Sequence, residues 1–135
     1  MAFTNNFEDQ IAIRALIDSY SDAVFRRDAN DWGACWAEDA LWSLLGTEVC
    51  GRAAIVSFWE QAMSTFRFVA FFSQPGSIEV EGDHATGRVY THEVIENLHG
   101  ILTRPVGRYD DIYVKSDGAW LFAERRYTML NGGAA

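Results

Sequence analysis

The strongest constraint on the fold is a β-hairpin that the sequence predicts at Val106–Thr128, near the end of the chain. Two runs rich in aromatic and β-branched residues flank the short turn Ser116-Asp117-Gly118. Such runs on either side of a glycine-containing turn indicate two antiparallel strands, in which Gly118 can adopt a positive φ. The rest of the chain is therefore interpreted around an antiparallel sheet.

The first strand of this hairpin carries neighbouring carboxylates that point to opposite faces of the sheet. Asp111 shares a face with Tyr109 and Tyr113, whereas Asp110 shares the other face with its own neighbours. Whichever face is buried takes a carboxylate with it, and a buried carboxylate needs a partner, a proton or a pocket. The possible ionic partners on the second strand are Arg125 and Arg126. Strand parity does not decide which arginine points inward, because one bulge exchanges the two faces.

Three segments in the first half of the chain predict helices. The first extends from about Phe7 to Arg27, with Asn6 as its N-cap. A short helix is expected at Trp32–Ala37, capped by Asp31, and a third at about Gly51–Ser64. The buried stripe of the first helix is Ile13, Leu16, Ile17, Tyr20 and Val24.

Four further segments predict strands: Ala40–Leu45, Phe66–Ser73, Ser77–Glu81 and Ala85–Asn97. Together with the hairpin they make about six strands. We expect one α+β domain over residues 1–135, in which a curved antiparallel sheet forms a cone closed by three N-terminal helices. Such a cone has a natural cavity where the first helix crosses its open mouth.

The composition limits the classes of partner. Aromatic residues make up 14% of the chain, which indicates an aromatic-lined cavity or a hydrophobic interface between subunits. A net charge of −8 argues against nucleic acid and anionic membrane as partners. The N-terminal stretch is unlike a signal peptide, and two isolated cysteines suggest a reduced, cytoplasmic environment. Three histidines without ligand spacing predict no metal, and no cofactor is expected.

Three stretches give the chain a family likeness: residues 13–42, the motif GRAAI at Gly51–Ile55, and residues 107–126 of the hairpin. On these motifs the sequence resembles the SnoaL-like branch of the nuclear-transport-factor-two-like superfamily. Relatives in that superfamily include ketosteroid isomerase, scytalone dehydratase and limonene epoxide hydrolase. The resemblance implies a cone-shaped fold, and since some members are not enzymes, fold alone does not assign an activity.

Four positions depart from the polar residues that the resemblance would imply. Phe25 stands where dehydratases and dehydrochlorinases place an aspartate, and Leu44 where an isomerase base or a dehydratase tyrosine would lie. Ala70 falls near the dehydratase histidine, and Ile95 at a second acid–base position. The dehydratase and dehydrochlorinase machinery is therefore absent as such.

Three candidates for catalysis remain. Tyr20 matches the oxyanion-hole tyrosine of ketosteroid isomerases, and Asp111 lies at or near that family's protonated aspartate donor. We expect these two side chains to meet across the pocket mouth. Glu93 on the long strand should face the cavity, either as a general base or as half of an ion pair with Arg125 or Arg104. The residues expected to bind substrate are Phe25, Trp42, Leu44, Phe68, Ala70, Phe72, Ile95, Tyr109, Arg125 and Tyr127.

These residues suggest a cofactor-independent lyase or isomerase. Its substrate would be a hydrophobic aromatic or polycyclic small molecule, as in polyketide or aromatic metabolism, and the chemistry would be dehydration, isomerisation, cyclisation or carbon–carbon cleavage. The alternative is a non-catalytic binding or assembly module, similar to the β subunit of a ring-hydroxylating dioxygenase. Tyr90, His92 and Val94 should lie on the outer face of the sheet, which predicts a homodimer or homotrimer.

Overall fold

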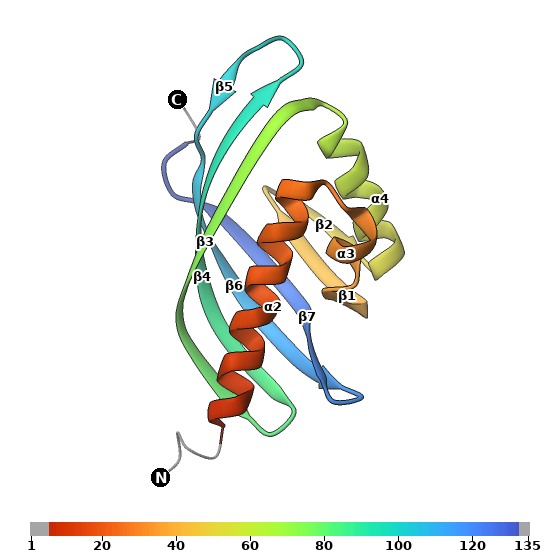
Figure 1. The fold of residues 1–135 in the computed structure, drawn as a ribbon, viewed down its shortest axis with the longest axis vertical. Helices are drawn as coiled ribbons and strands as arrows, with labels where there is room; N and C mark the ends of the chain where they lie inside the picture. The colour runs from red at the N-terminus through yellow and green to blue at the C-terminus, as the bar shows by residue number, and fades with distance from the viewer. Residues whose placement is uncertain (1–5, 133–135) are drawn as a thin grey trace.

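A long, curved and unclosed sheet organises the chain, and helices cover its concave side (Figure 1). The computed structural model describes residues 6–132, so the first residues of the stretch judged unlike a signal peptide lie outside it. The helices are α2 (Phe7–Arg26), α3 (Ala29–Gly33) and α4 (Arg52–Met63). The strands are β1 (Trp36–Leu44), β2 (Thr47–Cys50), β3 (Phe66–Glu81), β4 (His84–Asn97), β5 (Leu102–Thr103), β6 (Val106–Ser116) and β7 (Ala119–Met129).

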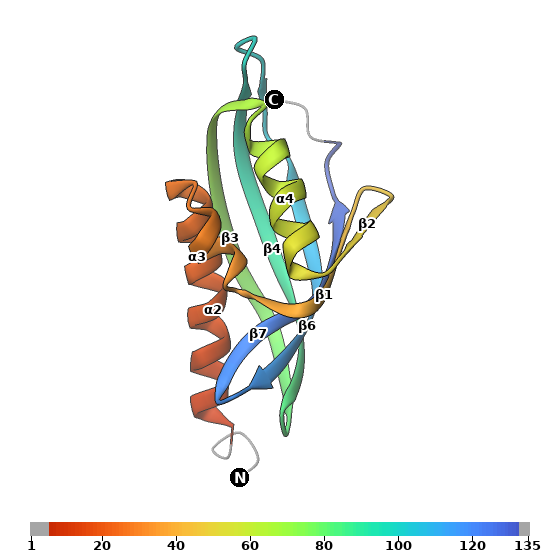
Figure 2. The same cartoon turned by 90° about the vertical axis from the view of Figure 1, so that its right-hand side faces the viewer.

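The strand order is β2-β1-β7-β6-β4-β3, and β5 pairs with β4. Every neighbouring pair is antiparallel except β1 and β7, which run parallel. Figure 2 shows α2 along one side of the curved sheet and α4 in front of it. Helix α2 packs mainly on β3 and β7, and α4 packs on β1. The predicted α+β cone with three helices is therefore confirmed, and the sheet has one strand more than expected.

The hairpin that anchored the sequence interpretation forms as β6 and β7. Ser116 pairs with Ala119, which leaves a two-residue turn in which Asp117 has φ 51° and Gly118 has φ 82°. Both central residues of the turn thus occupy the left-handed region, which aspartate and glycine tolerate. The register places Asp111 directly opposite Arg125.

Two boundaries differ from the sequence prediction near the second helix. Helix α3 starts at Ala29 and not at Trp32, because the Asp28 side chain caps it by accepting the backbone N–H of Asp31. The next strand starts early, at Trp36, which pairs with Phe122 before a register shift. Asn6 occupies the N-cap position of α2, but its side chain makes no capping hydrogen bond.

Strand β3 is continuous where the sequence predicted two strands separated by a Pro75-Gly76 turn. The chain passes through Pro75 with a register shift before Ile78 and keeps its pairing to β4. Proline lacks a backbone N–H, but β3 lies at the edge of the sheet, where an irregularity is tolerated. The short strands β2 and β5 were not predicted.

The core beneath the helices is strongly aromatic. Trp32 stacks on Trp59 with ring centroids 4.5 Å apart, and it makes edge-to-face contacts with Trp36 and Trp42. These residues and Tyr20 are buried. Aromatic packing at these separations stabilises a core beyond area burial alone. Within the described residues no helix has the length and apolar character needed to cross a bilayer.

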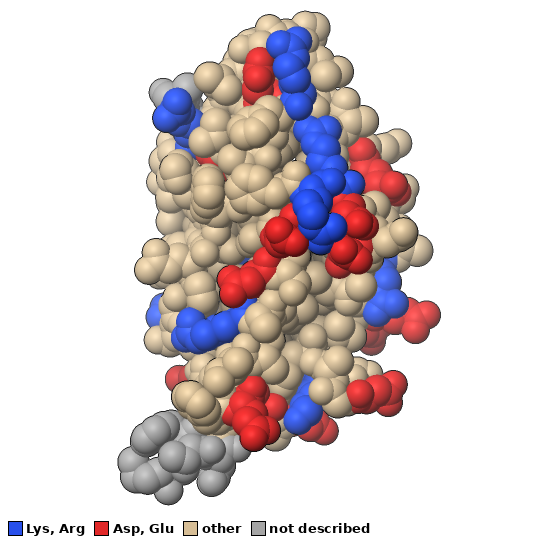
Figure 3. All heavy atoms as spheres, viewed as in Figure 1, with Lys and Arg blue, Asp and Glu red and all other residues tan. Residues whose placement is uncertain are grey.

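Charged side chains of both signs lie beside one another on the face shown in Figure 3. One cluster of opposite charges surrounds Arg26, whose guanidinium lies 2.9 Å from Asp22, 3.2 Å from Asp28 and 3.0 Å from Asp31. All four side chains are exposed, so these pairs add little to stability. They do neutralise the basic charge locally.

Candidate functional site

An apolar cavity of about 220 Å³ lies between the concave face of the sheet and helices α2 and α4. Aliphatic, aromatic and thioether side chains from both helices and five strands form most of its wall. Representative wall residues are Val24, Met63, Val69, Phe71, Ile95 and Met129. Polar groups are few, so each one that reaches the cavity has a large influence on what the cavity can bind.

Among residues 6–132, Glu93 on β4 is the one acidic residue that lines this cavity. Its carboxylate makes no hydrogen bond or ion pair with any described residue, although its backbone N–H donates to the Pro105 carbonyl. Burial raises the pKa of Glu93 from 4.5 to about 7. A carboxyl group with that pKa exchanges a proton readily near neutral pH. The inward orientation predicted for Glu93 is found, and neither Arg125 nor Arg104 pairs with it.

Among the described residues, three tyrosines line the cavity together with Glu93, and two of them are Tyr20 on α2 and Tyr109 on β6. The Tyr109 hydroxyl accepts a hydrogen bond of 3.1 Å from the indole nitrogen of Trp42. Burial raises the pKa of Tyr20 to about 12, and it raises the pKa of Tyr109 well above the ordinary value. Both phenols are therefore protonated at physiological pH and can donate a hydrogen bond to an oxygen atom in the cavity.

Arg125 on β7 lies beneath the two phenol rings. Its guanidinium carbon is 4.6 Å from the ring centroid of Tyr20 and 3.9 Å from that of Tyr109. The guanidinium also contacts Phe122 at 4.2 Å, and the Arg125 side chain is 1% exposed. Cation–π contacts of this kind hold the rings in place, and a buried cation favours any negative charge that forms nearby.

Asp111 neutralises this buried arginine. Its two carboxylate oxygens accept hydrogen bonds of 2.8 Å and 3.1 Å from Arg125, and Tyr113 donates a third bond of 2.7 Å. Burial raises the pKa of Asp111, while Arg125 and then Tyr113 act to lower it. Burial alone would lower the pKa of Arg125, but the Asp111 carboxylate raises it above its ordinary value. Asp111 is absent from the cavity wall, so the expected meeting of Asp111 with Tyr20 does not occur.

Two hydroxyl groups near Glu93 are buried without a regular hydrogen bond: those of Thr91 and Tyr127. Burial raises the pKa of Tyr127 to about 12, Glu93 adds to that rise, and Thr91 opposes it. The Tyr127 ring lies close against Gly107, where an added Cβ atom would overlap the ring. Glycine at this position is thus what allows the Tyr127 hydroxyl to reach the cavity region.

The remaining residues predicted to bind substrate do not all line the cavity. Trp42, Leu44, Ile95, Tyr109 and Tyr127 line the cavity, whereas Arg125 lies behind its wall. Four residues lie outside the cavity wall: Phe25, Phe68, Ala70 and Phe72.

The pairing register of β3 with β4 explains why the predicted residues of β3 lie outside the cavity wall. Phe71 pairs with Glu93 and Val69 pairs with Ile95, so these residues of β3 face inward and their neighbours face outward. Phe25 instead contacts Phe72 edge to face, with both side chains about half exposed. The sequence interpretation assigned the opposite parity to β3 and so missed Val69 and Phe71. If the register between β3 and β4 had been known, the inward position of Glu93 would have identified Val69 and Phe71 as lining residues.

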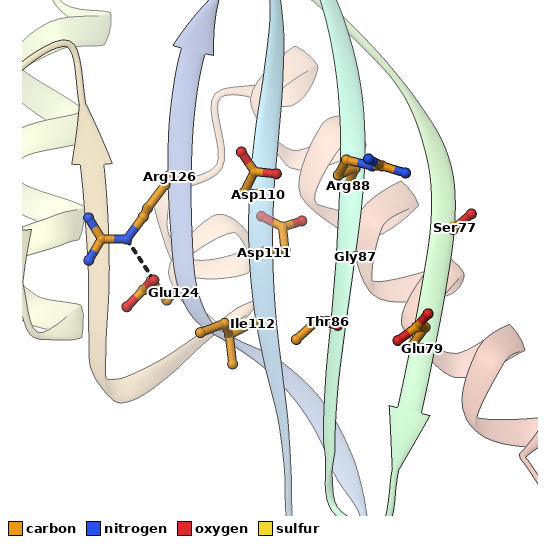
Figure 4. Close-up of a pocket in the computed structure, with 10 residues that line it drawn as sticks. All are labelled: Ser77, Glu79, Thr86, Gly87, Arg88, Asp110, Asp111, Ile112, Glu124 and Arg126. Atoms are coloured by element: carbon orange, nitrogen blue, oxygen red, sulfur yellow. Dashed lines mark hydrogen bonds and ion pairs between the residues drawn. The ribbon is translucent and has the colours of Figure 1, made fainter.

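A second hollow, of about 450 Å³, lies on the outer face of the sheet (Figure 4). Its charged lining residues come from β3, β4, β6 and β7, and Arg126 there binds Glu124 at 2.7 Å and Glu48 at 3.1 Å. Arg126 therefore points outward and Arg125 inward, which settles the choice that strand parity left open. Within residues 6–132 no group of three or more histidine, cysteine or acidic side chains is arranged to hold a metal ion.

The fold of this chain has counterparts among known proteins. A family model described as a SnoaL-like domain matches residues 5–126, which is most of the chain. The chain belongs to the SnoaL-like family. This SnoaL-like protein is also similar to an NTF2-like protein with a cystatin-like fold from Novosphingobium aromaticivorans, with 26% identity and a TM-score of 0.78 over 98% of this chain and 89% of that one.

Two further solved structures share the fold of this SnoaL-like chain. One is described as a putative scytalone dehydratase from Novosphingobium aromaticivorans, with 24% identity and a TM-score of 0.86 over 96% of this chain and 89% of that one. The other is hexachlorocyclohexane dehydrochlorinase LinA-type3 from Novosphingobium barchaimii, with 17% identity and a TM-score of 0.85 over 98% and 97% of the two chains. No protein of curated function matches the chain. These likenesses show the fold, and fold alone does not assign an activity.

Proposed function

We propose that this protein is a cofactor-independent lyase or isomerase that moves a proton on a small hydrophobic aromatic molecule. The observation that carries the proposal is an unpaired carboxyl group, Glu93, which shares an apolar cavity with the phenols of Tyr20 and Tyr109. A proton acceptor and two donors are the groups needed to remove a proton beside a carbonyl and to stabilise the resulting oxyanion.

In this mechanism Glu93 is the general base. Its carboxylate takes a proton from the carbon adjacent to a ketone carbonyl group. The C–H electron pair forms a double bond to the carbonyl carbon, and the carbonyl π pair moves onto the oxygen. Tyr20 and Tyr109 donate hydrogen bonds to the developing charge. Protonated Glu93 then returns the proton, either to another carbon, which is isomerisation, or to a leaving oxygen, which is elimination.

The size of the cavity supports a small substrate. Its volume of about 220 Å³ is below the range of roughly 300–1,000 Å³ that is typical of pockets for drug-sized ligands. A molecule of one or two rings suits this space better than the polycyclic class that the sequence also allowed. Its apolar body would contact side chains such as Met63, Phe71 and Ile95.

Removal of the Tyr20 hydroxyl tests the proposal. Tyr20→Phe keeps the ring over Arg125 but removes one donor, so we expect kcat to fall by roughly a hundredfold, as for loss of one oxyanion-hole donor. The measurement is turnover across a panel of aromatic ketones and phenols, together with a crystal structure containing β-naphthol. Bound β-naphthol with no turnover of any panel member would favour the non-catalytic alternative, and β-naphthol outside the cavity would contradict the proposal.

We also expect the protein to form a homodimer or homotrimer through the outer face of the sheet. Large apolar side chains are exposed there, with Phe68 at 49%, Phe72 at 53% and Tyr90 at 43%. A sheet face of this composition is typically covered by another subunit. Sedimentation equilibrium at micromolar concentration should give twice or three times the mass of the chain, and Phe72→Asp should shift it toward monomer. A wild-type monomer at that concentration would contradict the expectation.

A further inference from the structure

Three residues other than glycine adopt a positive φ in the part of the chain that the structure describes: Arg27, Leu45 and Asp117. Arg27 ends helix α2, where its guanidinium donates to the carbonyl oxygens of Met63 and Phe66. Asp117 occupies a hairpin turn that favours aspartate. Leu45 neither ends a helix nor is a residue type that favours this turn, since leucine adopts the left-handed conformation only at an energetic cost.

The turns that contain Leu45 and Asp117 have nearly the same backbone. Leu45-Gly46 has φ values of 48° and 87°, and Asp117-Gly118 has φ values of 51° and 82°. Each is a two-residue connection between paired antiparallel strands. Such turns prefer asparagine, aspartate or glycine at the first position, because a larger side chain crowds the adjacent peptide there. Leu45 therefore destabilises the β1–β2 hairpin relative to a residue like Asp117.

Burial does not offset this strain, because Leu45 is 63% exposed. Its surroundings do provide a reason for an apolar side chain. Leu45 lines the cavity that contains Glu93, and the other described residues of the cavity wall are buried or half-buried. Leu45 thus stands at the mouth, at the tip of the hairpin that extends from the edge of the sheet in Figure 2.

We propose that Leu45 is a specificity-determining residue that packs on the apolar end of the bound ligand at the cavity mouth. This inference rests on the proposed function, since it uses the same cavity. The left-handed turn holds the isobutyl group of Leu45 at the rim, where ligand binding removes it from water. The strain in the turn is the cost of placing an apolar side chain at that point.

The inference narrows the class of ligand. The polar groups of Glu93, Tyr20 and Tyr109 lie inside the cavity, so the oxygen of the ligand points inward. The end that faces Leu45 is then apolar, for example an aromatic edge or an alkyl substituent. A carboxylate or an ammonium group at this end would lose its hydration against leucine and should bind poorly.

Two substitutions of Leu45 distinguish the effect of backbone strain in the turn from the effect of the apolar contact with the ligand. Leu45→Asn suits the left-handed turn, so we expect Tm to rise by roughly 2–4 °C. It also removes the apolar contact, so Kd for β-naphthol should increase roughly tenfold. Leu45→Ala loses the same contact but keeps a side chain in the unfavourable conformation. We expect it to weaken β-naphthol binding to a similar extent with little gain in Tm.

Asp117→Leu is the matched control. It places leucine in nearly the same backbone conformation at a turn that does not line the cavity. We expect Tm to fall by roughly 2–4 °C and Kd for β-naphthol to stay unchanged.

Isothermal titration and thermal unfolding of the full chain measure both quantities. If the wild type binds β-naphthol and both Leu45 variants bind it equally well, the inference is wrong while the proposed function stands. A Tm for Leu45→Asn no higher than that of the wild type would refute the strain argument. Failure of the wild type to bind β-naphthol would contradict the proposed function and the contact at Leu45 together.

Discussion

Glu93→Gln is expected to lower kcat/KM by roughly 10²–10⁴-fold, the range for loss of a general base. Glutamine has almost the same shape as glutamate, so the cavity wall should remain intact while the proton acceptor is lost. In the wild type, kcat/KM should rise with pH and level off above about pH 7, where Glu93 becomes ionised. This rising limb should be absent from the residual activity of the variant.

The same substitution should stabilise the protein at neutral and higher pH. Burial raises the pKa of Glu93 from 4.5 to about 7, so the folded state holds this proton more tightly than the unfolded state. The stability associated with neutral Glu93 is fully present below pH 4.5 and is lost as pH rises toward 7. The loss is on the order of 3 kcal/mol. Because glutamine stays neutral, the free energy of unfolding of Glu93→Gln should exceed that of the wild type above pH 7.

Glu96→Gln is the control for both measurements. Glu96 lies on the same strand but pairs with Arg67 at 3.2 Å and is absent from the cavity wall. We expect its activity and its stability profile to match the wild type closely, since exposed ion pairs contribute little. If Glu93→Gln retains full activity, Glu93 is not the base. If its stability falls above pH 7, the carboxylate has a partner that the geometry does not reveal.

Asp111→Asn is expected to destabilise the fold by about 3–5 kcal/mol, because it leaves the Arg125 guanidinium buried without a counter-charge. Chemical denaturation should show a lower midpoint with an unchanged m-value. Asp110→Asn provides a matched control one residue away. Asp110 is exposed and pairs with Arg108 at 3.2 Å, so its loss should cost about 0–1 kcal/mol.

This prediction distinguishes the two roles considered for Asp111. A protonated donor would tolerate asparagine, which keeps a hydrogen-bond donor, and stability would change little. A carboxylate that neutralises Arg125 does not tolerate it. The double variant Asp111→Asn with Arg125→Met should recover part of the lost stability, because it also removes the unpaired charge. A double variant less stable than Asp111→Asn alone would contradict the ion-pair role.

The sequence predicted well those elements whose signals lie within a short stretch of the chain. The period of apolar residues placed α2 and α4 within about a residue of their observed ends, and the Asp117-Gly118 turn placed the last hairpin. Glu93 was correctly oriented because β4 is long and regular enough for alternation to hold along it. These predictions depend on neighbours in sequence and not on which strand pairs with which.

The features that could not be predicted depend on the register between paired strands. The pairing of Asp111 with Arg125 follows from the register of β6 and β7. A bulge after Ile112 shifts this register, so the partner of Asp111 cannot be found by counting residues back from the hairpin turn. The inward side of β3 is likewise set by its pairing to β4 across two register shifts, one between Phe66 and Phe68 and one between Pro75 and Ile78. None of these three irregularities has a local sequence signature strong enough to place it to the residue.

The close approach of Tyr127 to Gly107 has a consequence for how this site can diverge. An added Cβ atom at Gly107 would overlap the Tyr127 ring, so a larger residue there requires this ring to move or to be replaced. A homologue with a smaller residue in place of Tyr127 loses the hydroxyl beside Glu93. Divergence toward other substrates is therefore expected to pass through paired replacements on β6 and β7, which alignments of close homologues should show as covariation.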